Sequence, residues 1–584
     1  MTIILKIAEM MQLLDKPTVY IAVFTLCWFV VLAFFASMKK LQNQITCVVM
    51  AAIPVVHFVI FFIVNFTVGA PMKVVTRHGA YLIASLIFCL VALGLPRRKK
   101  NVLKLVLSGI SAILVTAFSI TAILVDGMAM HYGNFSQPGY GESMAALITE
   151  VEQNYVLRDH KEIDFDELRK VYIPLAEEAE KNHDEEAFAE VVANFCYEFH
   201  DGHFYIRITD YDLRERVNNR MSGNDYGFSM LRLDDGSVIA ILADENTEAS
   251  KQGIHNGTVI TAWDGVAINE AIESVRCVRS AIPFHSYPIE ANEDLIRPIY
   301  LAGQGGDTVD VTFIDDSGNE KTVTVPKIGC YYDRLLAAIT PLVDKRCEEF
   351  GYATMLDDHV GYICIPCEEY DKLLDVTASL NDDYPAVREL ITSRIEGLKA
   401  QGMTSLVIDL RDNDGGLDVI NEEVATLFTK EEIQIRAGIP DGNKAFAVSD
   451  YWIWTVKANG CYADTPVVAL VNCGCASSGD VLAHHLSECN NVTLMGYTTT
   501  WGSAQCMGGE CLLSGGHIEV RYPIMATLYM NGDVFVDAGK DRVSTIPLDV
   551  KIPLDRTAVS VMYEDGQDYE LAYACAYLNG QIAV

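Results

Sequence analysis

The sequence predicts a multidomain protein in which four transmembrane helices precede a larger region built around an α/β core. Three observations support this class. Nearly uncharged apolar runs occupy the first 126 residues, a helical pattern follows them, and strands alternate with helices from residue 361 onward. Half of the 584 residues are apolar and the mean hydropathy is +0.19, which is unusual for a soluble protein. The apolar runs of the first 126 residues account for this excess.

The amino-terminal part, residues 1–126, is expected to cross the membrane four times. Each apolar run is about long enough for a hydrocarbon core of roughly 30 Å. A cleaved signal peptide would be one short run. The runs are residues 19–38, 45–68, 79–95 and 105–125. Lys and Arg are concentrated in the first and third loops, which predicts that both termini and the remaining chain lie on the extracytoplasmic side of the plasma membrane.

Charge divides the chain at the same boundary. Residues 1–126 hold 11 Lys and Arg against 3 Asp and Glu, whereas the remainder holds 33 against 75. So acidic a region repels nucleic acid and anionic lipid surfaces, and neither is expected as its partner. The membrane contact is therefore assigned to the four helices alone.

A strand-to-helix turn carries the candidate nucleophile. Residues 466–471 are apolar and β-branched, residues 481–486 read as the start of a helix, and small residues with two adjacent hydroxyls, Ser477 and Ser478, lie between them. A serine in such a turn stands clear of the sheet, and N–H groups at the helix start can face an oxyanion. The alternative is an ordinary turn in which one serine is the helix N-cap.

A second turn supports the catalytic interpretation. Residues 406–410 read as a buried strand, and the polar turn that follows ends in Gly415 and Gly416. Paired glycines let a backbone approach a ligand closely and leave N–H groups able to donate.

Together the two turns resemble the C-terminal processing (tail-specific) serine peptidases. That family has a strand ending in Asp-Leu-Arg-x-Asn-x-Gly-Gly and a later strand running into Ser-Ala-Ser-x-x-Glu or a variant; the counterparts here are residues 409–416 and 475–480. The resemblance, which covers roughly residues 143–580, implies a ClpP/crotonase-like core with Ser477 as nucleophile. It implies an oxyanion hole made by the N–H of Ser478 and one from the pair Gly415 and Gly416.

The base is expected to be a histidine, because the lysine of one family branch is missing. That branch places it downstream of the serine in a Phe-Gly-Lys-Gly setting, and residues 496–505 contain none. The other branch, similar to tricorn protease and the retinoid-binding-protein repeats, uses an Asp-Gly-His sequence, which points to His203. His200 is the competing histidine, and His484 and His485 are expected on a helix surface or in packing.

The acid of the triad is expected to be Asp537. The histidine branch places a glutamate in a Glu-Gly-x-Gly-Val-x-Pro-Asp setting, and residues 535–549 match it with stretched spacing. Asp480, one helical turn after the serine, is interpreted as a structural cap partner.

The remaining organisation follows from pattern and resemblance. A linker spans residues 127–142, a helical neck ending in Asp-Gly-His spans 143–221, and the peptidase core spans 331–584. Residues 222–330 look like a PDZ domain, which binds peptide ends beside a sheet edge. Its carboxylate-binding loop is expected at Tyr226, Gly227, Phe228 and Ser229; the rival interpretation is a β-domain without a ligand.

Cysteines and cofactor motifs add little. Cys506 and Cys511 flank a glycine-rich turn and could form a disulfide, whereas Cys364 and Cys367 lie on a predicted strand and are interpreted as structural. No metal or cofactor is expected. The sequence thus predicts a membrane-anchored serine endopeptidase acting on peptides or protein tails. An inactive peptide- or ligand-binding relative, and a membrane sensor or transport component with an accessory ectodomain, remain alternatives.

Overall fold

The computed structural model describes residues 131–278, 287–343, 347, 349–371, 375, 378, 383–441 and 444–582. The four predicted membrane runs lie outside these residues. Within the part that is described, no helix combines the length and apolar character needed to cross a bilayer. The chain divides into two compact units: residues 1–156, 439–447 and 507–525 form one, and residues 157–438, 448–506 and 526–584 form the other.

The first unit contains a strand within the segment that was expected to be linker. Strand β1 (His131–Asn134) pairs in parallel with β18 (Cys506–Leu512), and His131 lies opposite Gly509. Helix α6 (Tyr140–Asn154) follows and buries an apolar face that includes Leu147 and Val151. Backbone pairing with β18 thus holds part of the segment for which a linker is predicted.

The second unit begins with the rest of the predicted neck. Helix α7 (Phe165–Lys181) is capped by Asp164 and α8 (Glu185–Tyr197) by Asp184, whose carboxylates accept backbone N–H groups. Pro174 lies inside α7 without ending it. Strand β2 (Tyr205–Ile208) and helix α9 (Tyr211–Ser222) complete this segment.

The region expected to be PDZ-like contains an antiparallel sheet in the order β4-β5-β6-β8-β9, with β7 beside β6. Two of its strands, β8 and β9, form a hairpin in which Ile314 lies opposite Glu320. The longer stretch between β7 and β8 forms helices. The elements are β3 (Asn224–Asp225), β4 (Ser229–Arg232), β5 (Val238–Ile241), α10 (Glu248–Lys251), β6 (Val259–Trp263), β7 (Val266–Ala267), α11 (Ile268–Glu273), α12 (Glu290–Leu301), β8 (Thr308–Ile314), β9 (Glu320–Pro326), β10 (Gly329–Cys330) and α13 (Tyr332–Val343).

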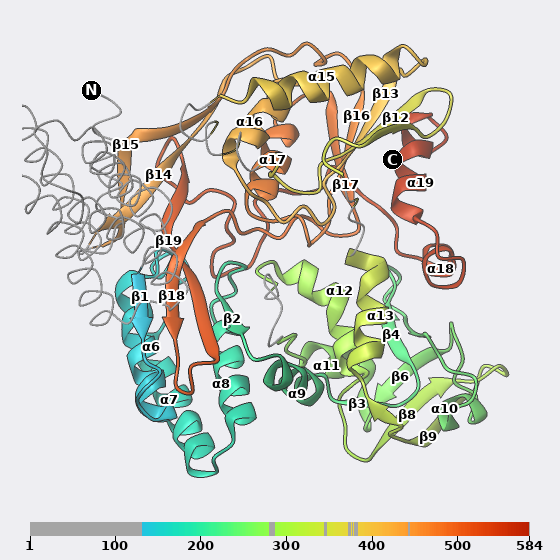
Figure 1. Ribbon diagram of the computed structural model, residues 1–584. Helices are drawn as coiled ribbons and strands as arrows, with labels where there is room; N and C mark the ends of the chain where they lie inside the picture. The colour runs from blue at the N-terminus through green and yellow to red at the C-terminus, as the bar shows by residue number, and fades with distance from the viewer. Residues whose placement is uncertain are drawn as a thin grey trace, which may run out of the picture. The chain divides into compact units, whose positions relative to one another are not determined.

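The predicted α/β core is confirmed. A six-stranded sheet has the order β11-β12-β13-β16-β17-β20, parallel from β12 to β20, with only β11 antiparallel (Figure 1). Its inner strands are buried on both faces, as continuous apolar runs require. The strands are β11 (Ala353–Met355), β12 (Val360–Cys364), β13 (Ser405–Asp409), β16 (Val467–Leu470), β17 (Val492–Gly496) and β20 (Val550–Lys551).

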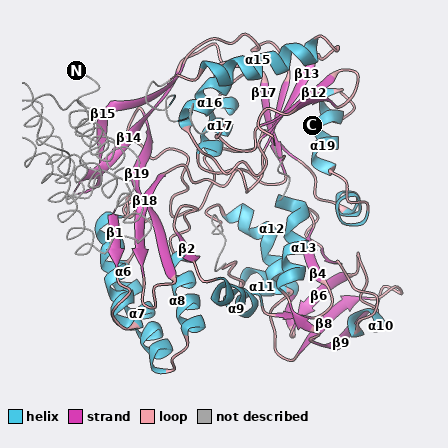
Figure 2. Ribbon diagram, in the orientation of Figure 1, coloured by secondary structure: helices cyan, strands magenta, loops and turns pink. Residues whose placement is uncertain are grey.

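Helices follow these strands, and the two faces of the sheet belong to two apolar clusters. Along β13, Leu406 and Ile408 pack in one cluster and Val407 in the other. Proline at the first position of α15 favours its start there. Figure 2 shows these helices in cyan: α15 (Pro385–Lys399), α16 (Asp418–Ala425), α17 (Ser478–Ser487), α18 (Arg556–Val559) and α19 (Tyr569–Leu578), with a π-helix at Ser560–Glu564 between the last two.

Three long strands lie outside the core sheet, and one disulfide is present among the described residues. Strand β14 (Ile433–Asp441) pairs antiparallel with β19 (Ile518–Tyr529), and β15 (Lys444–Val456) neighbours β14. The disulfide joins Cys347 to Cys364, whereas Cys506 and Cys511 are free thiols. The bridge considered for the glycine-rich turn is therefore not formed.

Candidate active site

Ser477 lies at the turn between β16 and α17, where its backbone is held in a rare conformation. Its φ is 59° and its ψ is −124°. For a residue other than glycine, such strain costs about 1–3 kcal/mol and is typical of functional sites. The Ser477 N–H donates to the backbone oxygen of Ser503 and to Oδ2 of Asp480, both at 3.1 Å. The turn is thus held from two sides, and Ser477 stays partly exposed between buried neighbours.

His203 belongs to a chain of three polar groups. It follows α8 and precedes β2, and only 2% of it is exposed. Its Nδ1 lies 2.9 Å from the Ser503 hydroxyl oxygen, and that hydroxyl donates to Oδ1 of Asp201 over 2.9 Å. The same carboxylate oxygen accepts the backbone N–H of His203 at 2.8 Å. Asp201 therefore holds the backbone of His203 directly, and it holds the imidazole through the Ser503 hydroxyl.

The direction of these bonds assigns the tautomer of His203. Because the Ser503 hydroxyl gives its hydrogen to Asp201, its oxygen accepts a hydrogen from Nδ1. The proton of the neutral ring thus sits on Nδ1, and Nε2 carries the lone pair. Burial lowers the pKa of His203, with a smaller opposing effect from the Asp201 charge. The ring is accordingly neutral at pH 7, the state that a general base requires.

Ser503 connects the candidate nucleophile with the candidate base. Its backbone oxygen accepts the Ser477 N–H while its hydroxyl bonds to the ring of His203. Asp480 reinforces this arrangement, since its carboxylate accepts the N–H groups of Ser477, Gly502 and Ser503. Among the contacts of these described residues, none joins the Ser477 hydroxyl directly to the imidazole. Such bonds often tighten only when substrate binds.

The glycine pair lies against the nucleophile turn. A Cβ added to Gly415 would lie 2.6 Å from the Ser477 Cβ and 2.9 Å from the Ser478 nitrogen, so only glycine fits there. The Gly415 N–H already donates to Oδ1 of Asn413, at 2.9 Å. No described residue accepts the N–H of Gly416 or of Ser478. Of the three predicted oxyanion donors, these two therefore keep their hydrogens available, and Gly415 instead supplies close approach.

The side chain of Asp537 contacts Gln505, Ala504 and Lys161, and not the imidazole of His203. Its Oδ2 accepts the Gln505 side chain at 2.6 Å and the Ala504 N–H at 3.1 Å, and its Oδ1 lies 3.6 Å from Nζ of Lys161. Burial raises the pKa of Asp537 to about 7. No hydrogen bond or ion pair between these described side chains joins it to His203. The structure brings Asp201 to the ring in its place.

The three other histidines considered as candidates, His200, His484 and His485, are packing residues. His200 has an edge-on ring contact with Tyr197, and burial lowers its pKa to about 3. His484 and His485 are buried in α17 against Phe535, and burial lowers their pKa values to about 4 and 3. They belong to the core and not to the helix surface.

The predicted peptide-carboxylate loop is closed by its own neighbours. Tyr226, Phe228 and Ser229 are fully buried, and the Ser229 hydroxyl bonds to another tyrosine. The Gly227 N–H donates to the carboxylate of Asp225 at 2.8 Å. All four residues of the predicted loop are thus buried in this structure.

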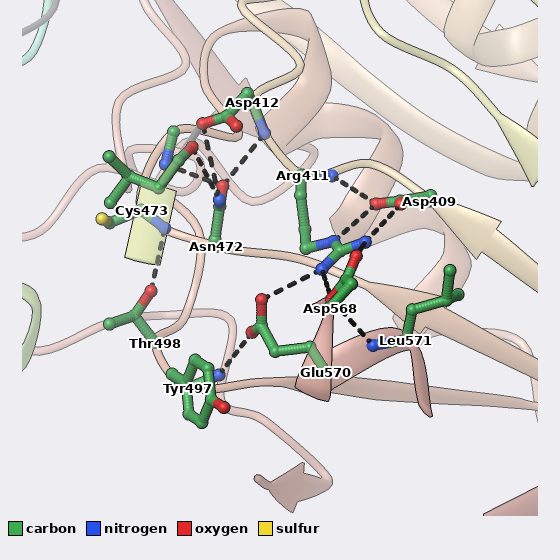
Figure 3. Close-up of polar contacts among 12 residues, drawn as sticks. Asp409, Arg411, Asp412, Asn472, Cys473, Tyr497, Thr498, Asp568, Glu570 and Leu571 are labelled. Atoms are coloured by element: carbon green, nitrogen blue, oxygen red, sulfur yellow. Dashed lines mark hydrogen bonds and ion pairs between the residues drawn. The ribbon is translucent and has the colours of Figure 1, made fainter. Parts of the chain in front are cut away.

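The arginine of the first motif is structural. Figure 3 shows the Arg411 guanidinium between Asp409 on one side and Asp568 and Glu570 on the other. Glu570 in turn accepts the Tyr497 N–H at 3.1 Å. The cluster thus ties the end of β13 to the start of α19, and it fixes the strand that leads into the glycine pair.

Sequence reasoning missed two residues of the site. Asp201 stands within the Asp-Gly-His sequence that identified His203, so its position was a usable signal. Ser503 lies in the stretch searched for a lysine base, and nothing about a lone serine there indicated contact with a histidine 300 positions earlier.

Comparison with known proteins finds a family match for part of the chain, which does not include Asp201 and His203. The model of peptidase family S41 matches residues 359–533. The chain is 28% identical over 203 residues to a carboxyl-terminal-processing protease of Picosynechococcus sp., and 31% identical over 110 residues to one of Synechocystis sp.. These alignments cover 34% and 19% of this chain, and 40% and 24% of the two relatives. The chain thus matches less than half of either relative's length.

Solved structures show weaker likeness. Mature CPAF has a TM-score of 0.45 at 12% identity, with 76% of this chain and 98% of that chain covered. The photosystem II D1 C-terminal processing protease has a TM-score of 0.31 at 17% identity, with coverage of 74% and 98%. For tricorn protease the TM-score is 0.30 at 14% identity, with coverage of 76% and 37%.

Proposed function

Because residues 359–533 match the model of peptidase family S41, we propose that the chain is a serine endopeptidase that cleaves unstructured peptides or the C-terminal tails of proteins. The name shared by both curated relatives supports protein tails as the substrate class. Cleavage proceeds through an acyl-enzyme on Ser477, and no metal or cofactor takes part.

One observation carries the proposal: Ser503 is bonded both to the backbone of Ser477 and to the ring of His203. A serine hydroxyl needs a base within reach to become a nucleophile. With its Nδ1 proton held by Ser503, His203 offers Nε2 to the Ser477 hydroxyl. The ring that becomes protonated during attack is then stabilised by Asp201, through the intervening hydroxyl.

The tetrahedral intermediate needs donors for its oxyanion. The N–H groups of Ser478, at the start of α17, and of Gly416 suit this role, because neither has an acceptor among the described residues. Close approach of Gly415 to the Ser477 turn supports the same assignment. Removing one such donor typically costs about 10²- to 10³-fold in kcat.

The direct test is the variant Ser477→Ala. We expect it to lose peptide turnover by on the order of 10⁴-fold or more, and to lose labelling by a fluorophosphonate probe. Ser487→Ala, which removes a hydroxyl bonded only within α17, is the matched control and keeps both. A wild-type chain that binds peptides without cutting them, and that takes no probe, would instead indicate the inactive peptide-binding relative.

A second comparison identifies the acid. Asp201→Asn removes the charge beside Ser503 and is expected to lower kcat/KM by roughly 10²- to 10⁴-fold. Asp537→Asn keeps an oxygen acceptor for the Ala504 N–H and is expected to cost less than about tenfold. The opposite ranking would restore Asp537 as the acid of the triad.

We further propose that the peptidase is anchored in the plasma membrane by the four apolar runs and faces the extracytoplasmic side. The apolar runs, the positions of Lys and Arg around them and the Cys347–Cys364 disulfide support this, since disulfides persist in oxidising compartments. The full chain should stay with membranes in alkaline carbonate, and protease added to intact cells should digest its C-terminal part. Release by carbonate or protection from that protease would contradict the proposal.

A further inference from the structure

Glu368 is a completely buried carboxyl group whose backbone is joined to the glycine pair. Its exposed fraction is 0%. Its N–H donates to the Gly415 oxygen at 2.9 Å, and its own oxygen accepts the Leu417 N–H at 2.9 Å. These two bonds form a parallel β-bridge between Glu368 and Gly416. The backbone that presents the Gly416 N–H is therefore held in place by Glu368.

The side chain of Glu368 reaches the same turn through Asn413. Its Oε1 accepts the Asn413 amide at 2.8 Å, and the Asn413 Oδ1 accepts the Gly415 N–H at 2.9 Å. The backbone oxygen of Asn413 accepts the N–H of Ala476, the residue before the nucleophile, at 2.7 Å. One continuous set of hydrogen bonds thus runs from the Glu368 carboxyl to both sides of the oxyanion site.

The packing around this set leaves little freedom. A Cβ added to Gly416 would lie 2.3 Å from the Glu368 oxygen, so the two backbones are in direct contact. Misplacing a catalytic group by about 1 Å can cost 10²-fold in rate. A change at Glu368 that moves the glycine pair would therefore reach the chemistry without touching the substrate.

We propose that Glu368 is a positioning residue of the oxyanion site, which holds Asn413 and the backbone of Gly415 and Gly416 against the nucleophile turn. The proposal rests on the proposed peptidase function for its catalytic consequence. It assigns a role to a residue outside both sequence motifs.

The charge state of Glu368 follows from its surroundings. Its Oε2 has no hydrogen-bond partner among the described residues. The titratable groups that face it are the carboxylates of Asp414 and Asp418 and the thiols of Cys367 and Cys475. Burial, with a smaller effect of these carboxylates, raises the pKa of Glu368 to about 8. The group is thus neutral at pH 7, and ionisation above pH 8 would bury an uncompensated charge beside the glycine pair.

The test compares three variants of the full chain in a peptide turnover assay from pH 6 to 10. Glu368→Gln keeps the neutral shape and should retain kcat within about threefold at pH 7, while losing the alkaline decline near pH 8. Glu368→Ala should lower kcat by about 10- to 100-fold with little change in KM. Glu369→Gln, at the exposed neighbour, is the matched control and should keep the wild-type profile.

Two outcomes would overturn the proposal: a Glu368→Gln variant that keeps the alkaline decline, or a Glu368→Ala variant with wild-type kcat. Amide hydrogen exchange of residues 412–418 separates this proposal from the peptidase function. Exchange there should accelerate in Glu368→Ala and stay at the wild-type rate in Glu368→Gln, even if the wild-type chain cuts no peptide. Equal exchange in all three proteins would remove the positioning role irrespective of activity.

Discussion

Replacing Ser503 with alanine removes the hydroxyl group that lies between His203 and Asp201. Two buried hydrogen bonds are lost, one of them to a carboxylate. A bond to a charged group is worth about 1.5–3 kcal/mol and a neutral one about 1 kcal/mol, so the transition state should lose about 2.5–4 kcal/mol. Since each 1.4 kcal/mol is a factor of ten, kcat/KM should fall by about 10²- to 10³-fold.

The structure also predicts what the substitution leaves intact. The bonds of Ser503 to Ser477 and Asp480 use its backbone, so the nucleophile turn should keep its shape. Steady-state turnover of a peptide with a reporter group should therefore show a fall in kcat with KM changed by less than about threefold. The melting temperature, measured in parallel, checks that the variant is folded.

A double-mutant cycle tests whether Asp201 acts on the ring through Ser503. Because Asp201 acts on the ring partly through Ser503, the double variant Ser503→Ala, Asp201→Asn should lose little more activity than either single variant. Losses that multiply would show that the two residues act independently. Wild-type activity in a folded Ser503→Ala protein would refute the connection between them altogether.

Three further predictions test the surroundings of the site. The value of kcat/KM should fall on acidification with an apparent pKa below 6.5, because burial lowers the pKa of His203 and only the neutral ring can accept a proton; a pH profile measures it. Gly415→Ala should abolish turnover in a folded protein, since the added Cβ would collide with Ser477 and the backbone at φ +84° favours glycine. Arg411→Ala should lower the free energy of unfolding in urea by about 3–5 kcal/mol, because two buried carboxylates lose their partner.

Each of these predictions has a contrary result. An apparent pKa above 6.5 would mean that another group controls the acid side of the profile. Gly397→Ala, at a helical position with open space around it, is the control for the glycine and should leave turnover unchanged. Lys430→Ala removes an exposed ion pair and should cost at most about 1 kcal/mol, so an equal loss in both variants would contradict the special place of Arg411.

The core was predictable because its signals are local. Buried apolar runs such as residues 406–410 and 467–471 can only be central strands, and the structure places them side by side in a parallel sheet. The start of α15 is likewise favoured by Pro385, whose backbone effect acts within one turn. The two turns of the motifs then follow from where these strands end.

The acid and its connecting serine could not be derived in the same way. Asp537 was chosen by its place in a family pattern, but its neighbours Lys161 and Gln505 come from other parts of the chain. The contact between His203 and Ser503 joins segments 300 positions apart, and no local sequence pattern indicates it. Contacts of this kind depend on how the helices and strands pack, so they are seen only in the folded structure.

Two other predictions, the carboxylate-binding loop and the linker, concern segments that are held by hydrogen bonds from the chain itself. The sequence Tyr226 to Ser229 resembles a carboxylate-binding loop, yet Asp225, one residue earlier, takes the Gly227 N–H. Similarly, residues 131–134 belong to the stretch predicted as a linker because it is rich in Gly, Tyr and Ser, and in the structure they pair with β18. In both cases a hydrogen bond from the chain itself occupies the backbone, and amino-acid composition does not predict such a bond.

The central claim is that Ser477 attacks with the help of His203. Mass spectrometry of the fluorophosphonate-treated protein tests it most directly. We expect one modified peptide, carrying the label on Ser477, with labelling slowed by at least about 10³-fold in His203→Ala. A label on any other residue, or undiminished labelling of Ser477 in that variant, would contradict it.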